Sequence, residues 1–190
     1  MKDYICILGR NPKLSMLELV SYCKRKKITY ELRSYNSRLA SISASSPLNI
    51  NELGGIVKIA EETTLDHLIP NKNKITFALT TVDSKDVLPT LKGMWKKEKI
   101  KAMQRFTSTY DIPPSKAKTL DLDIIVYRNK VYKVNAISSP KEYKHRDETR
   151  PSFDAKKVIS IRLAKMLINL AQAEKEILDP FCGTGTILQE

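Results

Sequence analysis

The chain has 190 residues, with 33 Lys and Arg against 21 Asp and Glu, which gives a formal net charge of +12. This length allows one large or two small domains, and an apolar content of 42% supports a packed core. No stretch suggests a membrane span or a signal peptide, and three widely spaced cysteines suit neither a disulfide framework nor a zinc site. We expect a cytoplasmic protein whose charge attracts polyanions, above all nucleic acid; the alternative is an ordinary lysine-rich surface.

The first third of the chain is predicted to form a small unit of strands and helices. The expected elements are a strand at 3–8, a helix from Ser15, strands at 28–33 and 38–44, a short helix at 47–53 and a strand at 56–61. The helices are expected from apolar residues every three to four positions, and the strands from alternation or apolar runs. The order βαββαβ is typical of a ferredoxin-like fold.

The second third follows a linker at 66–73, where His67 is expected to be a surface residue. The expected elements are a strand at 74–81, a helix at 84–100 capped by Asp83 or Ser84, a strand at 103–108, a short helix opened by Pro113-Pro114, and a hairpin of 122–127 and 130–137. Trp95 is expected in the core of this unit, and a base-stacking platform is the alternative.

Cations cluster on this second unit. Between residues 92 and 118, the acids Glu98 and Asp111 stand among a clear excess of Lys and Arg. One-sided clustering of this kind pairs with phosphates without conveying base specificity. The residues predicted to contact RNA are Lys92, Lys96, Lys97, Lys99, Arg105, Lys116, Lys118, Lys144, Arg146 and Arg150.

Residues 141–154 are polar and are predicted to be an interdomain linker. Within it, His145 has no Cys or Ser partner nearby, so a catalytic role is not favoured. The apolar stretch 155–172 is expected to be a helix, capped by Ser152 or Asp154, that covers the sheet of the next domain.

The last stretch, Ile177 to Leu188, has the pattern of a buried strand, a tight glycine turn and a helix start. Glycines at such a turn let the backbone approach a ligand closely. A dinucleotide fingerprint is excluded because Leu188 takes the place of its third glycine, and a P-loop is excluded because Gly-Lys-Ser/Thr is absent. An ordinary strand–loop–helix turn is the alternative to a ligand site.

Asp179-Pro180-Phe181-Cys182-Gly183-Thr184-Gly185-Thr186 resembles motif I of class I S-adenosylmethionine-dependent methyltransferases, most of all those that methylate exocyclic amines in RNA. In that family the glycine loop packs against the methionine half of the cofactor, and the carboxylate at the strand end orients its ammonium group. The resemblance implies cofactor binding by Asp179, Pro180, Phe181, Cys182, Gly183, Gly185 and Thr186.

The resemblance extends through the rest of the chain. Gly9-Arg10-Asn11-Pro12-x-Leu14-Ser15, Leu53-Gly54-Gly55-x-Val57-Lys58-Ile59-Ala60 and Tyr143-x-x-Arg146-Asp147-x-x-Arg150-Pro151 are similar to segments of archaeal tRNA (guanine(10)-N2) methyltransferases. The implied fold class is α+β. Its implied parts are a ferredoxin-like domain at 1–65, a THUMP domain at 66–140, a linker at 141–154, and the first β-α segment of a Rossmann-like class I methyltransferase domain at 155–190. The implied partner is tRNA.

The family positions the guanine amine with an Asp/Asn-Pro-Pro-aromatic loop after motif I, and this sequence has none. No catalytic residue and no metal ligand is therefore predicted. We expect a truncated or split enzyme that is inactive unless a second chain completes its methyltransferase domain, docking on the strand edge at Ile177-Leu178 and on the helix at 155–172. The alternatives are a non-catalytic tRNA-binding subunit and part of a DNA or rRNA amine methyltransferase.

Overall fold

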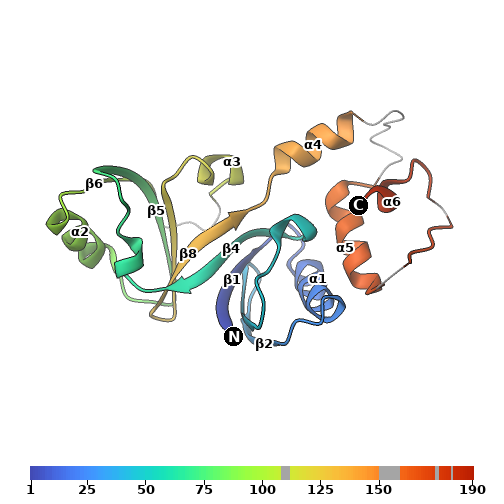
Figure 1. Cartoon of the computed structure of the whole chain (residues 1–190), viewed down its shortest axis with the longest axis horizontal. Coiled ribbons are helices and arrows are strands. Elements are labelled where there is room, and N and C mark those ends of the chain that lie inside the picture. Colours follow the sequence, from blue (N-terminus) through green and yellow to red (C-terminus); the bar gives the residue numbers. More distant parts are fainter. Residues whose placement is uncertain (108–111, 150–158, 174–175, 181) are drawn as a thin grey trace.

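A computed structural model describes residues 1–107, 112–149, 159–173, 176–180 and 182–190 (Figure 1). In this part of the chain, strands and helices combine around one mixed sheet with the strand order β2-β3-β1-β4-β8-β7-β5-β6. The strands are β1 (Lys2–Leu8), β2 (Tyr30–Tyr35), β3 (Leu39–Ala44), β4 (Ile56–Thr63), β5 (Lys74–Val82), β6 (Lys101–Thr107), β7 (Leu122–Tyr127) and β8 (Lys130–Ile137). The helices are α1 (Pro12–Arg25), α2 (Leu88–Lys97), α3 (Pro114–Ala117), α4 (Pro140–Glu148), α5 (Ile161–Ala171) and α6 (Thr186–Gln189), with 3₁₀ turns η1 (Ile50–Glu52) and η2 (Asp66–Leu68).

The first half of the sheet is antiparallel, with β1 between β3 and β4 and α1 packed on one face. The helix begins at Pro12, earlier than expected from Ser15, because the Asn11 side chain accepts a hydrogen bond from the Leu14 backbone N–H at 3.2 Å. All predicted strands of this half are present. The expected helix at 47–53 is reduced to the single turn η1.

The second half contains the parallel pairs β5–β6 and β5–β7 and the predicted β7–β8 hairpin. Arg128 and Asn129 form the hairpin turn, both with left-handed φ (48° and 63°). The helix α2 starts later than expected, and the predicted Asp83–Ser84 cap is wrong. Ser84 Oγ donates to the Val82 carbonyl at 2.9 Å, while Asp86 accepts from the Leu88 N–H at 2.9 Å.

Trp95 lies in the core between α2 and the sheet. Only 1% of it is exposed, and its indole Nε1 donates to the Leu68 carbonyl at 3.0 Å. Its ring meets Phe77 edge-on with centroids 4.7 Å apart. The core prediction is therefore confirmed, and the base-stacking alternative is wrong.

The two halves form a single sheet because β4 pairs with β8, across the boundary predicted near residue 65. The sheet also curls strongly. Ser34 on the edge strand β2 lies 2.9 Å from the Tyr127 hydroxyl on β7, although four strands separate β2 and β7 in the sheet order. Apolar side chains of β1, β4, β7 and β8 meet inside this curl.

The C-terminal part differs most from expectation. The linker predicted at 141–154 contains α4 up to Glu148. The helix expected at 155–172 is α5, capped by Ser160, whose hydroxyl accepts from the Leu163 N–H at 3.3 Å; the proposed caps Ser152 and Asp154 lie outside the described residues. It packs on α1 and does not cover a second sheet (Figure 1). No described helix has the length and apolar character needed to cross a bilayer.

Candidate functional site

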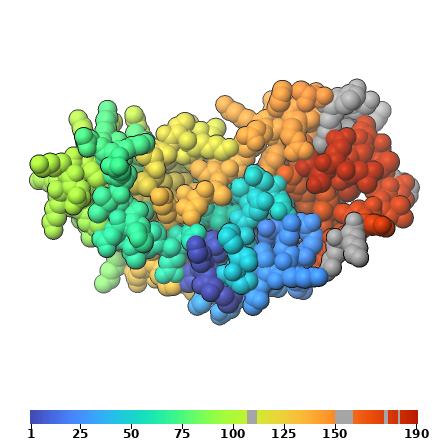
Figure 2. Space-filling model, in the orientation of Figure 1, coloured from blue at the N-terminus to red at the C-terminus, as the bar shows by residue number. Residues whose placement is uncertain are grey.

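The motif I loop lies at the C-terminal end of the molecule, next to α5 (Figure 2). Gly183 and Gly185 both have left-handed backbone angles, with φ of 54° and 76°, which residues with a Cβ rarely adopt. The Gly185 N–H donates to the Cys182 carbonyl at 2.7 Å, and α6 follows directly. The sequence folds locally in this way because the two glycines permit a turn that other residues would strain.

The side chains of this loop differ in exposure. Pro180, Cys182 and Gly183 are exposed, Asp179 and Gly185 are half-buried, and Thr186 is buried. Phe181 lies outside the described residues. The described loop atoms are thus accessible to a ligand, and a Cβ built on Gly185 meets only the end of Gln189 at 3.9 Å. These residues fit one wall of a cofactor site.

The strand predicted before the loop is not formed. Residues 176–179 have no strand structure, and Leu178 is 90% exposed. A parallel strand in the middle of a Rossmann-like sheet is held by neighbours on both sides, and no described strand pairs with this segment. The predicted exposed sheet edge at Ile177-Leu178 is therefore wrong, because there is no strand to present an edge.

A hollow surrounded by lysines lies on α2 and β6. These two elements are at the opposite end of the molecule from α5 and α6 (Figure 1). The hollow has a volume of about 340 Å³, and we call it the lysine hollow; its lining residues are Lys92, Trp95, Lys96, Lys99, Ile100, Lys101 and Ala102. Within the described residues, none of these lysines forms an ion pair. Lysines without an acidic partner in the described structure are available to pair with the phosphates of a polyanion.

The other residues predicted to contact RNA are spread along the molecule. Lys97 and Arg105 are exposed near the lysine hollow, and the Lys116 ammonium lies 5.7 Å from the centre of the Phe106 ring. Lys118 donates to Ser139 Oγ at 2.8 Å.

The remaining three residues predicted to contact RNA are Lys144, Arg146 and Arg150, and the first two of them belong to α4. Lys144 pairs with Glu148 at 3.5 Å, and Arg146 pairs with Glu190. Arg150 lies outside the described residues. The tertiary structure thus brings together the α2 cations and leaves the α4 cations next to the motif I segment.

A second basic surface was missed from the sequence. Arg10 and Lys13, at the start of α1, line a hollow of about 600 Å³ with the half-exposed ring of Tyr35. Arg10 and Arg38 also line an adjoining hollow of about 350 Å³ that reaches Pro113-Pro114. Arg38 lies far along the sequence from Arg10 and Lys13, so no local run of cations indicates the surface.

The role of Gly54-Gly55 was likewise not predicted from the sequence. Both N–H groups donate to the buried Glu18 carboxylate, and α5 contacts the same turn through Arg162 and Asn169. Burial raises the pKa of Glu18, and the Gly54 and Gly55 N–H groups partly offset this effect. The detectable signal was a set of polar residues on a largely apolar helix, Arg162, Lys165 and Asn169, at spacings of three and four positions.

The two histidines have no catalytic arrangement. His67 Nδ1 contacts the Thr64 hydroxyl at 3.4 Å in an exposed turn, which confirms its surface position, and His145 is exposed on α4. Among the described residues, no group of three His, Cys, Asp or Glu could hold a metal ion. Pro113-Pro114 starts α3, as predicted.

A family model matches the segment that carries motif I. Residues 149–190 match the family described as RMKL-like, methyltransferase domain. The tRNA (guanine(10)-N2)-dimethyltransferase of Pyrococcus abyssi (strain GE5 / Orsay) is 42% identical over 50 residues, which are 26% of this chain and 15% of that protein. The matched part is thus a small fraction of the curated relative.

Solved structures with some likeness share little sequence with the chain. PH1313 from Pyrococcus horikoshii Ot3 has 19% identity and a TM-score of 0.43, with 73% of this chain and 55% of that chain covered. TrmN from Thermus thermophilus has 15% identity and a TM-score of 0.46, with 98% and 60% covered. Similarities this low assign no function. Residues 149–190, which contain motif I, are thus similar to the RMKL-like methyltransferase domain family.

Proposed function

We propose that this chain is the RNA-binding and cofactor-loop part of an S-adenosylmethionine-dependent tRNA guanine-N2 methyltransferase. The observation that carries the proposal is the motif I loop, with two left-handed glycines in an accessible turn inside the segment that matches a methyltransferase family. The name of the curated relative supports tRNA as substrate and guanine N2 as the methylated atom.

The cofactor would be held from one side by the loop. Gly183 and Gly185 leave room for close approach of the methionine half, and Asp179 is the carboxylate expected to accept from its ammonium group. When bound, S-adenosylmethionine supplies a sulfonium methyl group. The role of these residues is to bind and orient.

Residues 1–140 would bind the RNA. The proposal assigns residues 1–65 to a ferredoxin-like domain, supported by the antiparallel order β2-β3-β1-β4, and residues 66–140 to a THUMP domain. The lysine hollow supports an RNA grip, because its four lysines carry no ion pairs in the described structure. We expect this complex to form in the cytoplasm, where tRNA is processed.

Residues 1–190 would bind and orient the cofactor but would not by themselves hold the amine that is methylated. An exocyclic guanine amine must be held in line with the methyl group, and the sequence has no Asp/Asn-Pro-Pro-aromatic loop to do so. The second candidate function is a non-catalytic tRNA-binding subunit. It is favoured by residues 176–179, which pair with no described strand and so leave the cofactor site with one wall.

Two binding measurements test the proposal. Fluorescence anisotropy with a labelled tRNA transcript should give tight binding that weakens steeply between 50 and 200 mM salt, on the order of 10³-fold for six phosphate contacts. The variant K92E/K99E should bind tRNA at least about tenfold more weakly, with a shallower salt dependence. The control K24E/K85E makes the same charge change at exposed lysines outside the lysine hollow and should bind like the parent.

Equal loss in both variants, or equal affinity for tRNA and duplex DNA, would contradict a specific RNA grip. The enzyme and subunit candidates separate on calorimetry with S-adenosylmethionine, alone and with a candidate second chain. Heat of binding that G183V abolishes supports the enzyme. Absence of binding in every mixture, with tRNA binding intact, supports the non-catalytic subunit.

A further inference from the structure

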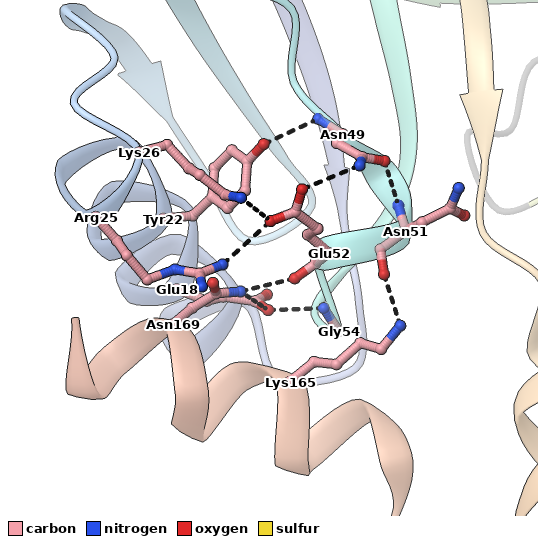
Figure 3. A network of polar contacts seen from close by, with 10 residues as sticks. All are labelled: Glu18, Tyr22, Arg25, Lys26, Asn49, Asn51, Glu52, Gly54, Lys165 and Asn169. Atoms are coloured by element: carbon pink, nitrogen blue, oxygen red, sulfur yellow. Dashed lines mark hydrogen bonds and ion pairs between the residues drawn. The ribbon is translucent and has the colours of Figure 1, made fainter. Parts of the chain in front are cut away.

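The helix that precedes motif I is attached to the N-terminal half by a buried polar cluster, the α5 clamp, made of Glu18, Gly54, Gly55, Arg162 and Asn169. Figure 3 shows its members Glu18, Gly54 and Asn169. Glu18 on α1 is fully buried and accepts from the N–H groups of Gly54 at 2.6 Å and Gly55 at 2.7 Å. From α5, Asn169 Nδ2 donates to Glu18 Oε1 at 3.0 Å. One carboxylate thus joins three parts of the chain.

Other bonds of α5 extend this attachment along the same turn. Arg162 Nε donates to the Gly54 carbonyl at 2.7 Å, and Asn169 Nδ2 also donates to the Glu52 carbonyl at 2.8 Å. Lys165 Nζ reaches the Asn51 carbonyl at 2.6 Å (Figure 3). Because hydrogen bonds to backbone carbonyls need a defined geometry, these donors favour the observed register of the helix.

The two glycines allow the helix to come this close. A Cβ at Gly54 would lie 2.0 Å from the Arg162 carbonyl oxygen, and a Cβ at Gly55 would lie 2.6 Å from Met166 Cε. The first of these contacts is with backbone, which cannot move aside without shifting α5. The backbones of the Gly54-Gly55 turn and of α5 thus lie in direct contact. Packing of apolar side chains alone would not require the two backbones to come so close.

Motif I is in turn held to α5. Glu190, four residues after Thr186, has a buried side chain that accepts from Arg146 on α4 and lies 3.5 Å from Lys165 Nζ. Lys165 therefore contacts both the N-terminal turn and the end of the motif I segment. The position of the loop relative to the N-terminal half follows from that of α5.

The lysine hollow lies at the other end of the same continuous sheet (Figure 1). The buried Lys58–Asp123 pair joins β4 and β7 and so ties the two halves of that sheet. A continuous path of contacts thus runs from the lysines of α2 through the sheet and α1 to α5, and the contact between α1 and α5 is its last step.

We propose that the α5 clamp sets the position of motif I relative to the RNA-binding lysines, so that Glu18, Arg162 and Asn169 are positioning residues for RNA methylation. The positioning role in this inference rests on the proposed function, whereas the contacts of the α5 clamp do not depend on it. The clamp selects which nucleotide of a long RNA, held at the α2 end, reaches the methyl-donor loop. The α5 clamp would thereby set the distance between the part of the RNA that the α2 lysines bind and the base that is methylated.

The geometry is tested by distance measurement with spin labels on Cys182 and on T90C. Cys182 is exposed, Cys6 and Cys23 are buried, and Thr90 is an exposed residue of α2 outside the lysine hollow. The parent should show one narrow distance distribution. N169D, which sets a second carboxylate against Glu18, should broaden or split it.

The control L167D adds the same charge to α5 at an exposed position and should keep the narrow distribution. R162M weakens the clamp without burying a new charge, so it tests the clamp even if N169D disturbs folding, which circular dichroism would show. An unchanged distribution in R162M, or equal broadening in N169D and L167D, would overturn the proposal.

The functional consequence is tested by crosslinking. A benzophenone maleimide on Cys182 of the parent should crosslink a bound tRNA transcript at a narrow set of nucleotides. In R162M the crosslinks should shift to other nucleotides while the anisotropy affinity for tRNA stays that of the parent. An unchanged crosslink pattern would overturn the positioning role. Failure of tRNA to bind the parent would overturn the proposed function and leave the distance result standing.

Discussion

Lys58 on β4 and Asp123 on β7 form a buried ion pair, with Nζ and Oδ2 2.6 Å apart and only 2% and 5% of the side chains exposed. The pair crosses β8, which lies between these strands. Removing one member leaves the other charge buried without a partner, and this costs about 3–5 kcal/mol in known cases. We therefore expect K58M to lower the free energy of unfolding by roughly 3 kcal/mol.

Urea denaturation followed by circular dichroism measures this change. The double variant K58M/D123L should recover most of the loss, because neither charge remains and apolar side chains fill the space. If K58M and the double variant were equally unstable, packing around the pair would matter more than its charge.

Asp121 should make the protein sensitive to strong acid. Its carboxylate accepts from Lys72 Nζ at 2.5 Å and from the Thr76 N–H at 2.8 Å, and these bonds lower its pKa to about 2. A lowered pKa contributes stability above the unfolded value near 4, and this contribution is lost as the pH falls towards 2. D121N should therefore flatten the fall of the unfolding free energy between pH 4 and 2.

The variant K72M gives a graded comparison. It removes the largest cause of the lowered pKa but leaves both Thr76 donors, so its acid transition should fall between those of the parent and D121N. Urea midpoints measured at each pH give the three curves. Identical curves for the parent and D121N would show that another group, such as Asp3 with its pKa of about 2, governs the acid range.

Cys182 should be the one thiol that reacts quickly in the folded chain, because Cys6 and Cys23 are buried. Burial raises the pKa of both, to about 11 for Cys23, and the unreactive thiol form is therefore favoured. Labelling with a thiol reagent at neutral pH should give one fast equivalent on Cys182 by mass spectrometry, and three after denaturation. Fast labelling of Cys23 would contradict the packing of α1.

G54A should loosen α5, because its methyl group would lie 2.0 Å from the Arg162 carbonyl oxygen. We expect faster hydrogen exchange of the α5 amides and a lower Tm. G93A is the matched control, since a Cβ there meets nothing within 4 Å in the middle of α2. It should stabilise the protein by about 0.5–1 kcal/mol, through the better helix propensity of Ala. Similar Tm values for the two variants would contradict the close approach of α5.

Much of the secondary structure was predictable from local pattern. Hydrophobic periodicity and turn-forming residues in the local sequence predicted the strands β1 and β4, the hairpin at Arg128-Asn129 and the core position of Trp95. Helix starts were less accurate. They were set by single side-chain bonds from Asn11 and Asp86, which compete with other candidate caps nearby.

The glycine turn after Asp179 could be predicted from eight consecutive residues, because its pattern is local. The docking of α5 on α1 and Gly54-Gly55, the Lys58–Asp123 pair and the lack of a strand before motif I could not be predicted in this way. These features depend on interactions between residues that are distant in the sequence. Contacts such as that of Arg162 with Gly54 join residues more than a hundred positions apart, and a parallel strand forms only where neighbouring strands bind its backbone.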